Sequence, residues 1–445
     1  MGRESKRGDD ERVEVIEYNC TGLLQKNFLN LQAPKIPDLH IFVNLEFNSR
    51  FTCLCKNGIH MIERDIFQEA KYMLSQFRAL CITGPRQSGK TTLGKVLFKG
   101  KPYINFELPF IHAKAENNIA LFMNQYKSGA ILDEVQRIPV LFRQLQGMLD
   151  KSSKRGQFLL TGSNNFLLQE QISQSLAGRA GYLELLPLTF SELKKAKLSS
   201  SDISNHIIKG GYPEIWQENL NPYKWMSSYI QTYIQKDVRQ LRNIPNLAAF
   251  TRFVTLCANY AGQIINRDEL SKQTGVDTKT ILAWLGVLES SYIIYQLQPW
   301  YNNLNKRIIK SPKLYFYDTG LLCTLLGIQT KTALHKHQQY GAIFENWVIS
   351  EIKKNRMNNG INRGLYYFRD SAGNEVDLIM EKEGQPIAIE IKASAKPDRT
   401  ALRGLFYWLK NNPGSNCILI HGGLTNRAEN EQINLLTWME VANIS

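Results

Sequence analysis

Short apolar runs alternate with amphipathic segments through residues 61–200 of the chain. The amphipathic segments have apolar residues at helical spacing, beginning with MIERDIFQEAKYML from Met61. Strands that alternate with helices are joined by crossovers and pair in parallel, so this part is expected to form an α/β domain. The apolar runs predict five strands, at residues 78–83, 103–106, 128–133, 157–162 and 181–186.

Residues 201–330 are mostly helical in pattern, with a break at GGYPEIW (Gly210–Trp216). Asn266–Leu297 has the form of a helix-turn-helix, in which Gly275 makes the turn and Thr278 caps the second helix. A strand pair follows this segment. These elements together predict a helical and winged-helix middle domain.

Polar residues at 328–338 predict a linker, and residues 335–445 then return to an α/β pattern. The expected elements there are helices at 341–354 and 399–411, and strands at 365–369, 375–381, 386–392 and 416–420.

Residues 1–60 have a densely charged start and one alternating segment, Ile41–Phe47, that is typical of a half-buried strand. No chemistry is visible in them, so they remain an unassigned extension. Two interpretations stay open: a divergent extension, or a stretch that precedes a true start at Met61.

The first predicted strand, ALCIT, leads into GPRQSGKT (Gly84–Thr91), which fits the phosphate-binding pattern G-x-x-x-x-G-K-[ST] at every fixed position. In such a loop, backbone N–H groups and the start of a helix face the phosphates of a nucleotide. Lys90 is expected to reach the β and γ phosphates of ATP, and the Thr91 hydroxyl to bind Mg²⁺. The expected nucleotide-binding residues of this loop are Gly84, Pro85, Arg86, Gln87, Ser88, Gly89, Lys90, Thr91 and Thr92.

A second buried strand ends in Asp133-Glu134, within GAILDEVQR. We expect Asp133 to hold Mg²⁺ through water and Glu134 to polarise the attacking water as a general base. Ser163 and Asn164 follow a third strand, at the edge where open α/β sheets bind ligands, and one of them is expected to orient that water. Arg179, in SLAGRAG, is expected to act as an arginine finger in its own subunit or a neighbouring one, which would make the protein a homo-oligomer. A structural arginine is the alternative.

A series of motifs now occurs in one order: GPRQSGKTTL, LDEVQRIP, LLTGSNNFLL, SLAGRAGYLELLPLTFSEL, GGYPEIW, YIQTYIQKDVR and SPKLYFYDTGLL. This series resembles the prokaryotic AAA-superfamily ATPases that carry a C-terminal DUF4143 domain. The resemblance covers residues 61–445 and not residues 1–60. It implies an ATPase core of AAA type, and no settled cellular role.

The C-terminal part holds a carboxylate constellation. Asp377 lies on one predicted strand, and Glu390 and Lys392 lie on one face of the next. Glu345, on the preceding helix, is placed to join them. The spacing resembles the PD-(D/E)xK nucleases, with EVD in place of Pro-Asp, and implies a restriction-endonuclease-like fold. Glu345, Asp377 and Glu390 are then expected to hold Mg²⁺, with Lys392 activating water against a phosphate. A domain that binds a metal ion or grips DNA without cutting it is the alternative.

The chain is basic, with 54 lysines and arginines against 40 acidic residues. Residues 1–60 hold eight of each sign, so the excess lies in residues 61–445 and favours an anionic partner such as nucleic acid. Four basic residues fall in the predicted wing: Lys306, Arg307, Lys310 and Lys313. We expect them to contact the DNA backbone, since few polar residues are available for reading bases. The alternatives are a protein-docking module and a lid of the ATPase.

Seven cysteines are scattered without a CxxC pair, which supports neither a zinc site nor a disulfide framework. Cys81 and Cys417 lie in apolar runs and are expected to be core residues. No run is long enough to span a bilayer, so we expect a cytoplasmic protein without a membrane partner.

Two functional hypotheses follow. The first is an ATP-driven DNA-processing enzyme. The second is a nucleotide-dependent switch that binds a protein or DNA partner without cleaving it.

Overall fold

The structure is a computed structural model. It describes residues 61–444 with these exceptions: 164–167, 169–170, 173, 233–245, 301–310 and 426–432. The expected strand at Ile41–Phe47 and the basic residues Lys306, Arg307 and Lys310 lie outside the described residues.

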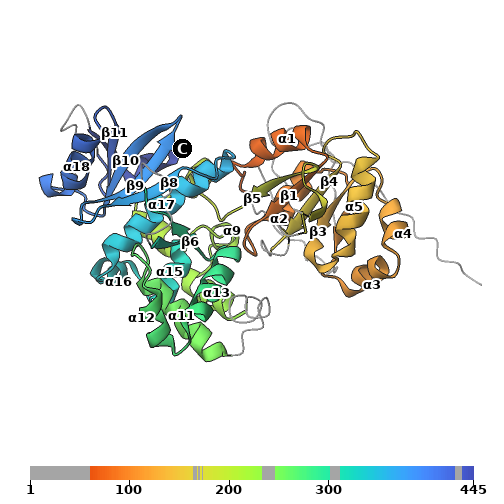
Figure 1. The fold of residues 1–445 in the computed structure, drawn as a ribbon, viewed down its shortest axis with the longest axis horizontal. Coiled ribbons are helices and arrows are strands. Elements are labelled where there is room, and N and C mark those ends of the chain that lie inside the picture. Colours follow the sequence, from red (N-terminus) through yellow and green to blue (C-terminus); the bar gives the residue numbers. More distant parts are fainter. Residues whose placement is uncertain are drawn as a thin grey trace, which may run out of the picture. The chain divides into compact units, whose positions relative to one another are not determined.

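Five parallel strands form the first sheet, in the order β2-β3-β4-β1-β5 (Figure 1). All five strands expected from the apolar runs are confirmed, each with bounds within two residues of the prediction. They are β1 (Ala79–Thr83), β2 (Tyr103–Asn105), β3 (Ala130–Asp133), β4 (Phe158–Gly162) and β5 (Ala180–Glu184).

Helices cover both faces of this sheet, as doubly wound strands require. Alternate residues of β1 face opposite ways: Ala79 and Cys81 pack with buried residues of α5 (Val140–Asp150), whereas Leu80 and Ile82 pack with α1 and α2. These two helices are Phe67–Gln76 and Lys90–Leu97, so α1 begins later than Met61. Helices α3 (Pro109–Asn117) and α4 (Ile119–Asn124) lie on the same face of the sheet as α5 and supply further buried residues.

The middle of the chain is helical, as expected, and ends in a short antiparallel pair, β6 (Ile294–Leu297) with β7 (Lys313–Phe316). Thr278 is not the cap of the second helix of the helix-turn-helix segment. The cap is Asp277, whose side chain accepts a hydrogen bond from the Thr280 amide. The helices are α7 (Phe190–Lys195), α8 (Ile203–Lys209), α9 (Pro213–Gln217), α10 (Pro222–Tyr229), α11 (Leu247–Asn259), α12 (Arg267–Thr274) and α13 (Thr278–Ser290).

The prediction of a linker at residues 328–338 is wrong. After α15 (Thr319–Leu325), the chain forms α16 (Lys331–Lys336), whose first turn is capped by the Thr330 side chain. Ile328 and Leu334 are buried in the core cluster, so this polar segment packs against the core through two apolar residues.

The C-terminal part has a long helix, α17 (Tyr340–Asn358), and a mixed sheet in the order β12-β11-β10-β9-β8. The expected strands are confirmed as β8 (Leu365–Arg369), β9 (Glu375–Lys382), β10 (Gln385–Lys392) and β11 (Asn416–His421), and the second helix as α18 (Arg403–Asn411). The sequence pattern missed β12 (Ile433–Thr437), a short edge strand that pairs in parallel with β11.

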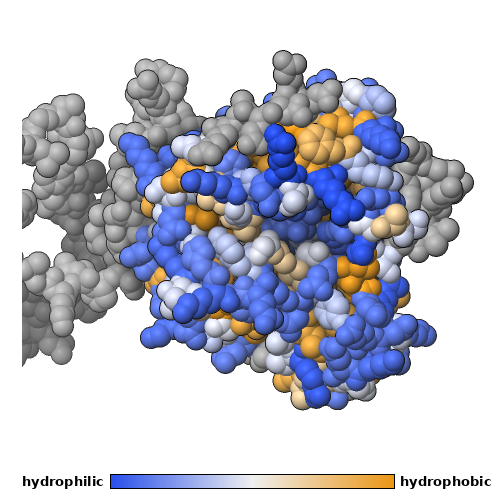
Figure 2. Space-filling model, turned by 90° about the vertical axis from the view of Figure 1, so that its left-hand side faces the viewer, coloured by the Kyte–Doolittle hydropathy of each residue, from blue (hydrophilic) through white to orange (hydrophobic). Residues whose placement is uncertain are grey.

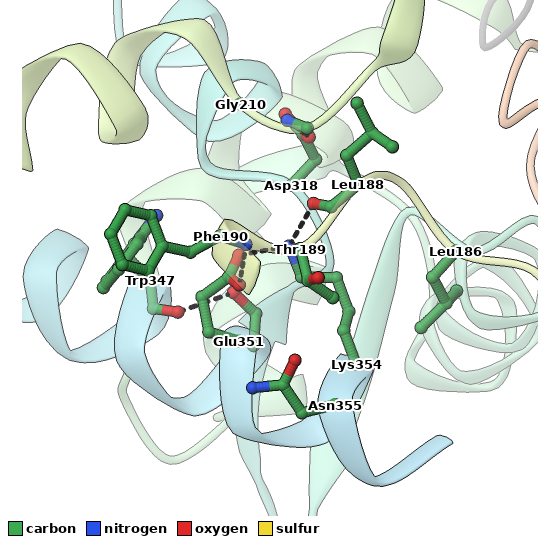
Figure 3. A network of polar contacts seen from close by, with 12 residues as sticks. Leu186, Leu188, Thr189, Phe190, Gly210, Asp318, Trp347, Glu351, Lys354 and Asn355 are labelled. Carbon is green, nitrogen blue, oxygen red and sulfur yellow. Dashed lines mark hydrogen bonds and ion pairs between the residues drawn. The ribbon is translucent and has the colours of Figure 1, made fainter. Parts of the chain in front are cut away.

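One cluster of buried apolar side chains extends from Leu186 to Ile444, so the middle and C-terminal parts share a core. At its edge, Glu351 of α17 accepts a hydrogen bond from the Phe190 amide (2.6 Å) and pairs with Lys354 (Figure 3). Lys354 also donates to the Leu188 carbonyl oxygen (3.0 Å). The chain that leaves the first sheet is therefore fixed to α17 by buried polar contacts.

The described residues include no helix that is long and apolar enough to cross a membrane. On the face drawn in Figure 2, hydrophilic residues predominate and hydrophobic ones form small separate patches. Cys81 and Cys417 are buried with free thiols, which confirms them as core residues.

Candidate functional site

The loop between β1 and α2 needs glycine at both of its fixed positions. Gly84 has φ +145° and Gly89 has φ +94°, which are conformations that other residues rarely adopt. A Cβ atom on Gly84 would lie 2.1 Å from the Leu185 carbonyl oxygen. The close approach of Leu185, the residue after β5, thus fixes the path of the loop, and the loop backbone leads directly into the first turn of α2.

Lys90, the first residue of α2, is buried within this loop. Its ammonium group donates hydrogen bonds to the carbonyl oxygens of Gly84 (2.9 Å) and Pro85 (2.7 Å). Burial lowers the pKa of Lys90 to about 8, and the charges of Glu134 and Asp133 act in the opposite direction. An anionic ligand beside this ammonium group would stabilise its charged form.

Asp133 ends β3 and receives hydrogen bonds from three hydroxyl groups. Thr91 Oγ1 and Tyr103 Oη donate to its Oδ2 atom, at 3.0 Å and 2.6 Å, and Thr161 donates to Oδ1. Tyr103 and Thr161 come from the two strands that flank β3, so the sheet order brings them to this carboxylate. Thr91 and Asp133, the two residues expected to hold Mg²⁺, are therefore in direct contact. Burial and the Asp133 charge raise the pKa of Tyr103 well above its ordinary value.

Glu134, the next residue, has a left-handed backbone (φ +55°) and caps a short 3₁₀ helix, Val135–Arg137. Its Oε2 atom accepts hydrogen bonds from Gln136 Nε2 (2.5 Å) and Ser163 Oγ (3.2 Å). Ser163 thus contacts the expected general base itself. Asn164 lies outside the described residues.

These groups line a cavity of about 400 Å³, large enough for a nucleotide-sized ligand. The P-loop residues from Arg86 to Thr92, apart from Ser88, form one side of it, together with Asp133 and Glu134. Helix α9 supplies the remaining lining residues, Pro213, Glu214 and Gln217. The sequence indicated only a break at GGYPEIW, and α9 as a wall of this cavity was missed.

Arg64 was also missed. Its side chain, only 8% exposed, donates to the carbonyl oxygens of Ser88 and Leu186 (both 2.6 Å) and to Glu192 Oε1 (2.9 Å). It therefore ties the P-loop to the segment that follows β5. The sequence pattern places Arg64 inside the amphipathic segment that begins at Met61, and a lone arginine there gives no signal for this role.

Strand β1, which precedes the P-loop, is also joined to the middle domain by side-chain hydrogen bonds. The hydroxyl groups of Thr83 and Tyr292 lie 2.6 Å apart, and Tyr292 donates to Glu184 Oε1 (3.0 Å). Tyr292 follows α13 and has a left-handed backbone (φ +58°), which is unusual for an aromatic residue.

Arg179 lies at the opposite edge of the sheet from the P-loop. It immediately precedes β5, whereas the P-loop follows β1, and these two strands are parallel. Its guanidinium group donates to both oxygens of Asp150, at 2.6 Å and 3.0 Å. The interpretation as an arginine finger within its own subunit is therefore wrong, and the pairing agrees with the structural alternative.

A second group of charges gathers in the C-terminal sheet. Lys392 Nζ lies 2.6 Å from Glu390 Oε1 and 3.6 Å from Asp377 Oδ2. The antiparallel register of β9 and β10 sets Asp377 beside this pair, where it accepts a hydrogen bond from the Ile391 amide (2.8 Å). The structure thus brings together the three residues expected from their spacing, with Ile391 facing the core.

Glu345 of α17 is held mainly by β7. It accepts a hydrogen bond from Tyr315 Oη (2.5 Å) and lies 3.6 Å from Lys313 Nζ, which also pairs with Glu375 (2.5 Å). The expectation that Lys313 contacts DNA phosphates is wrong, because this lysine is only 3% exposed. Its charge is used inside the protein, to balance two carboxylates that are distant in sequence.

Burial and neighbouring carboxylates raise the pKa of Glu345 to about 7 and that of Glu390 to about 8. Among the described residues, no three histidine, cysteine, aspartate or glutamate side chains are arranged to hold a metal ion. The expected Mg²⁺ site of Glu345, Asp377 and Glu390 stays a prediction. The ammonium groups of Lys313 and Lys392 lie beside its carboxylates in this structure.

The sequence of this chain is similar to those of two mycobacterial proteins of similar length. The uncharacterized protein Rv2008c of Mycobacterium tuberculosis is 32% identical over 378 residues, which cover 83% of this chain and 82% of that protein. The uncharacterized protein Mb2031c of Mycobacterium bovis gives the same values. The chain belongs to the family of these mycobacterial proteins.

Three consecutive segments of this chain match known domain families. Residues 76–194 match an AAA domain, residues 200–332 a domain of unknown function (DUF8612) and residues 340–441 a domain of unknown function (DUF4143). The expected AAA-type and DUF4143 domains are thereby confirmed.

Among solved structures, the Walker-type ATPase PABY2304 of Pyrococcus abyssi is 14% identical. It covers 60% of this chain and 96% of its own chain, with a TM-score of 0.42. A signal transduction ATPase with numerous domains from Pyrococcus horikoshii is 12% identical, with a TM-score of 0.24. That match covers 66% of this chain and 47% of the archaeal one.

Proposed function

We propose that this protein binds ATP with Mg²⁺ and hydrolyses it, and that the nucleotide state governs its binding to nucleic acid. The observation that carries the first half is the hydrogen bond from Thr91 to Asp133, beside the Lys90 ammonium group and the Glu134 carboxylate. A hydroxyl and a carboxylate in contact at the end of a β-strand are the protein ligands that Mg²⁺ takes in P-loop enzymes.

The residues present fit both ATP and Mg²⁺. The backbone conformations of Gly84 and Gly89 lead the loop into the first turn of α2, where free N–H groups suit a phosphate. Lys90 would bind the β and γ phosphates, and Thr91 with Asp133 would hold the metal ion, which neutralises phosphate charge when bound. Glu134 would accept a proton from the attacking water, with Ser163 holding the orientation of its carboxylate.

Steady-state ATP hydrolysis on the full chain tests this half. Lys90→Ala and Glu134→Gln should each lower the rate at least about 100-fold, and Glu134→Gln should retain ATP binding. Lys127→Ala, a change at an exposed lysine of the same domain, is the matched control and should keep the wild-type rate. A rate that survives both active-site changes would refute ATP hydrolysis at this site.

The charge distribution supports nucleic acid as the partner. Lys272 and Lys279 are exposed in the helix-turn-helix segment, and the excess of basic residues lies in the same 385 residues that form the three domains. Backbone contacts of this kind weaken steeply as salt rises. Hydrolysis and DNA binding should therefore be measured with and without duplex and single-stranded DNA, at two salt concentrations. DNA that neither binds nor changes the hydrolysis rate would favour a protein-directed switch.

The C-terminal group of charges favours binding without cleavage, which is the second of the two hypotheses. Lys392 already pairs with Glu390 and Asp377, and Lys313 with Glu345. The discriminating experiment compares the wild type with Asp377→Asn and Lys392→Ala in a Mg²⁺-dependent DNA cleavage assay. Cleavage that both variants abolish, with ATP binding intact, would instead establish the processing enzyme.

A further inference from the structure

Helix α9 lies outside the residues matched to the AAA domain and yet lines the ATP cavity. Pro213, Glu214 and Gln217 are its lining residues. The helix is fixed in place by its other side, where Ile215 is fully buried and Trp216 Nε1 donates to the Gly210 carbonyl oxygen (2.8 Å). Its cavity face is therefore a preformed part of the site.

Glu214 is the single charged residue that α9 presents to the cavity. Trp225 Nε1, from α10, donates a hydrogen bond to Glu214 Oε2 (2.9 Å), which holds the carboxylate in one orientation. A carboxylate is an acceptor only, so any ligand atom that it binds must be a hydrogen-bond donor or a cation.

The phosphates of ATP offer no such donor at neutral pH and would be repelled by this charge. Lys90 marks the phosphate end of the cavity and lies with Thr91 and Asp133, the proposed Mg²⁺ ligands, on the side formed by the P-loop and β3. Glu214 lies on the side formed by α9. The donors left in the nucleotide are the ribose hydroxyl groups and the exocyclic amine of the base.

We propose that Glu214 accepts a hydrogen bond from the nucleoside half of the bound nucleotide and so selects which nucleotide the site takes. The proposal rests on the proposed ATP binding. It gives the middle domain a direct part in nucleotide recognition, because the selecting carboxylate and the phosphate-binding loop belong to different domains.

The test measures dissociation constants by titration calorimetry with Mg²⁺, in a Glu134→Gln background that preserves the triphosphates. Four unlabelled nucleotides distinguish the donors: ATP, its 2′-deoxy and 3′-deoxy forms, and inosine triphosphate, which lacks the amine. Adding Glu214→Gln should weaken ATP binding about 10-fold or more, since the lost bond involves a charged acceptor. For the analogue that lacks the recognised donor, the same change should alter binding less than about twofold.

Two further variants make the result specific. Glu218→Gln changes an exposed carboxylate of the same segment that does not line the cavity, and it should bind all four nucleotides as the parent does. Trp225→Phe removes the group that orients Glu214, and it should produce a smaller loss with the same dependence on the analogue. An equal loss for all four nucleotides on Glu214→Gln, or no loss for any, overturns the proposal. A parent protein that binds no ATP refutes the proposed function instead.

Discussion

Removing the Arg64 side chain should both destabilise the ATPase domain and weaken nucleotide binding. Arg64→Met keeps the unbranched apolar part of the side chain and removes the guanidinium group. Three acceptors then lose their donor: the carbonyl oxygens of Ser88 and Leu186, and Glu192. The Ser88 carbonyl belongs to the P-loop itself, so the loop loses one of the contacts that hold it to the rest of the domain.

The magnitude follows from burial. Glu192 is fully buried, and breaking a buried ion pair by removing one partner costs about 3–5 kcal/mol. Glu192 keeps hydrogen bonds from the amides of Asp65 and Thr189 (both 2.8 Å), which limits the cost to this range. For a domain of this size, such a loss lowers the melting temperature by about 10–20 °C.

Thermal unfolding followed by circular dichroism, together with calorimetric titration of ATP at 10 °C, measures both effects. Arg143→Met is the matched control, because Arg143 is exposed on α5. We expect the control to melt with the wild type, and Arg64→Met to melt earlier and to bind ATP about 10-fold more weakly, since a less ordered loop must be fixed on binding. Equal melting temperatures and equal ATP affinities for Arg64→Met and the control would refute the role given to Arg64.

Three further predictions concern other parts of the chain. Because burial raises the pKa of Glu345 to about 7, the folded state holds a proton that the unfolded state releases, so this group's stability contribution is lost as pH rises through 7. The melting temperature should therefore fall from pH 5 to pH 8, and Glu345→Gln should flatten that fall; an unchanged slope would contradict this assignment. Tyr292→Phe should lower the free energy of unfolding by about 1–3 kcal/mol, because the partly buried Glu184 carboxylate loses a donor. Tyr72→Phe, at a 60% exposed site, is the control and should not change the free energy of unfolding. Equal denaturant midpoints for the two variants would count against a stabilising hydrogen bond from Tyr292 to Glu184. Arg179→Ala should keep ATP hydrolysis within about twofold of the wild type, since Arg179 pairs with Asp150 at the far edge of the sheet; a large loss that appears only in an oligomeric sample would instead place Arg179 in a neighbouring subunit's site.

Much of the first domain could be predicted because its signals are local. Each buried strand is a contiguous apolar run, and the P-loop is a contiguous pattern that ends one of them. Asp133 and Glu134 were found for the same reason, since they end another such run. Local patterns also placed Asp377, Glu390 and Lys392 on neighbouring strands.

The parts that were missed depend on contacts between distant residues. Tyr103 and Thr161 reach Asp133 only because β2 and β4 flank β3 in the sheet, and the sequence does not state the strand order. Lys313 was counted among surface charges because no acid lies near it along the chain. Its partners, Glu345 and Glu375, become neighbours only after α17 and β9 pack against β7.

The position of Lys313 also bears on how such a chain can be assembled in evolution. The lysine lies in the segment matched to one domain, and the carboxylates that it neutralises lie in the segment matched to the next. A gene fusion that transferred only residues 340–441 to a new neighbour would carry Glu345 and Glu375 without their counter-ion. The two segments should therefore be inherited as one unit, even though their sequences are described as separate domains.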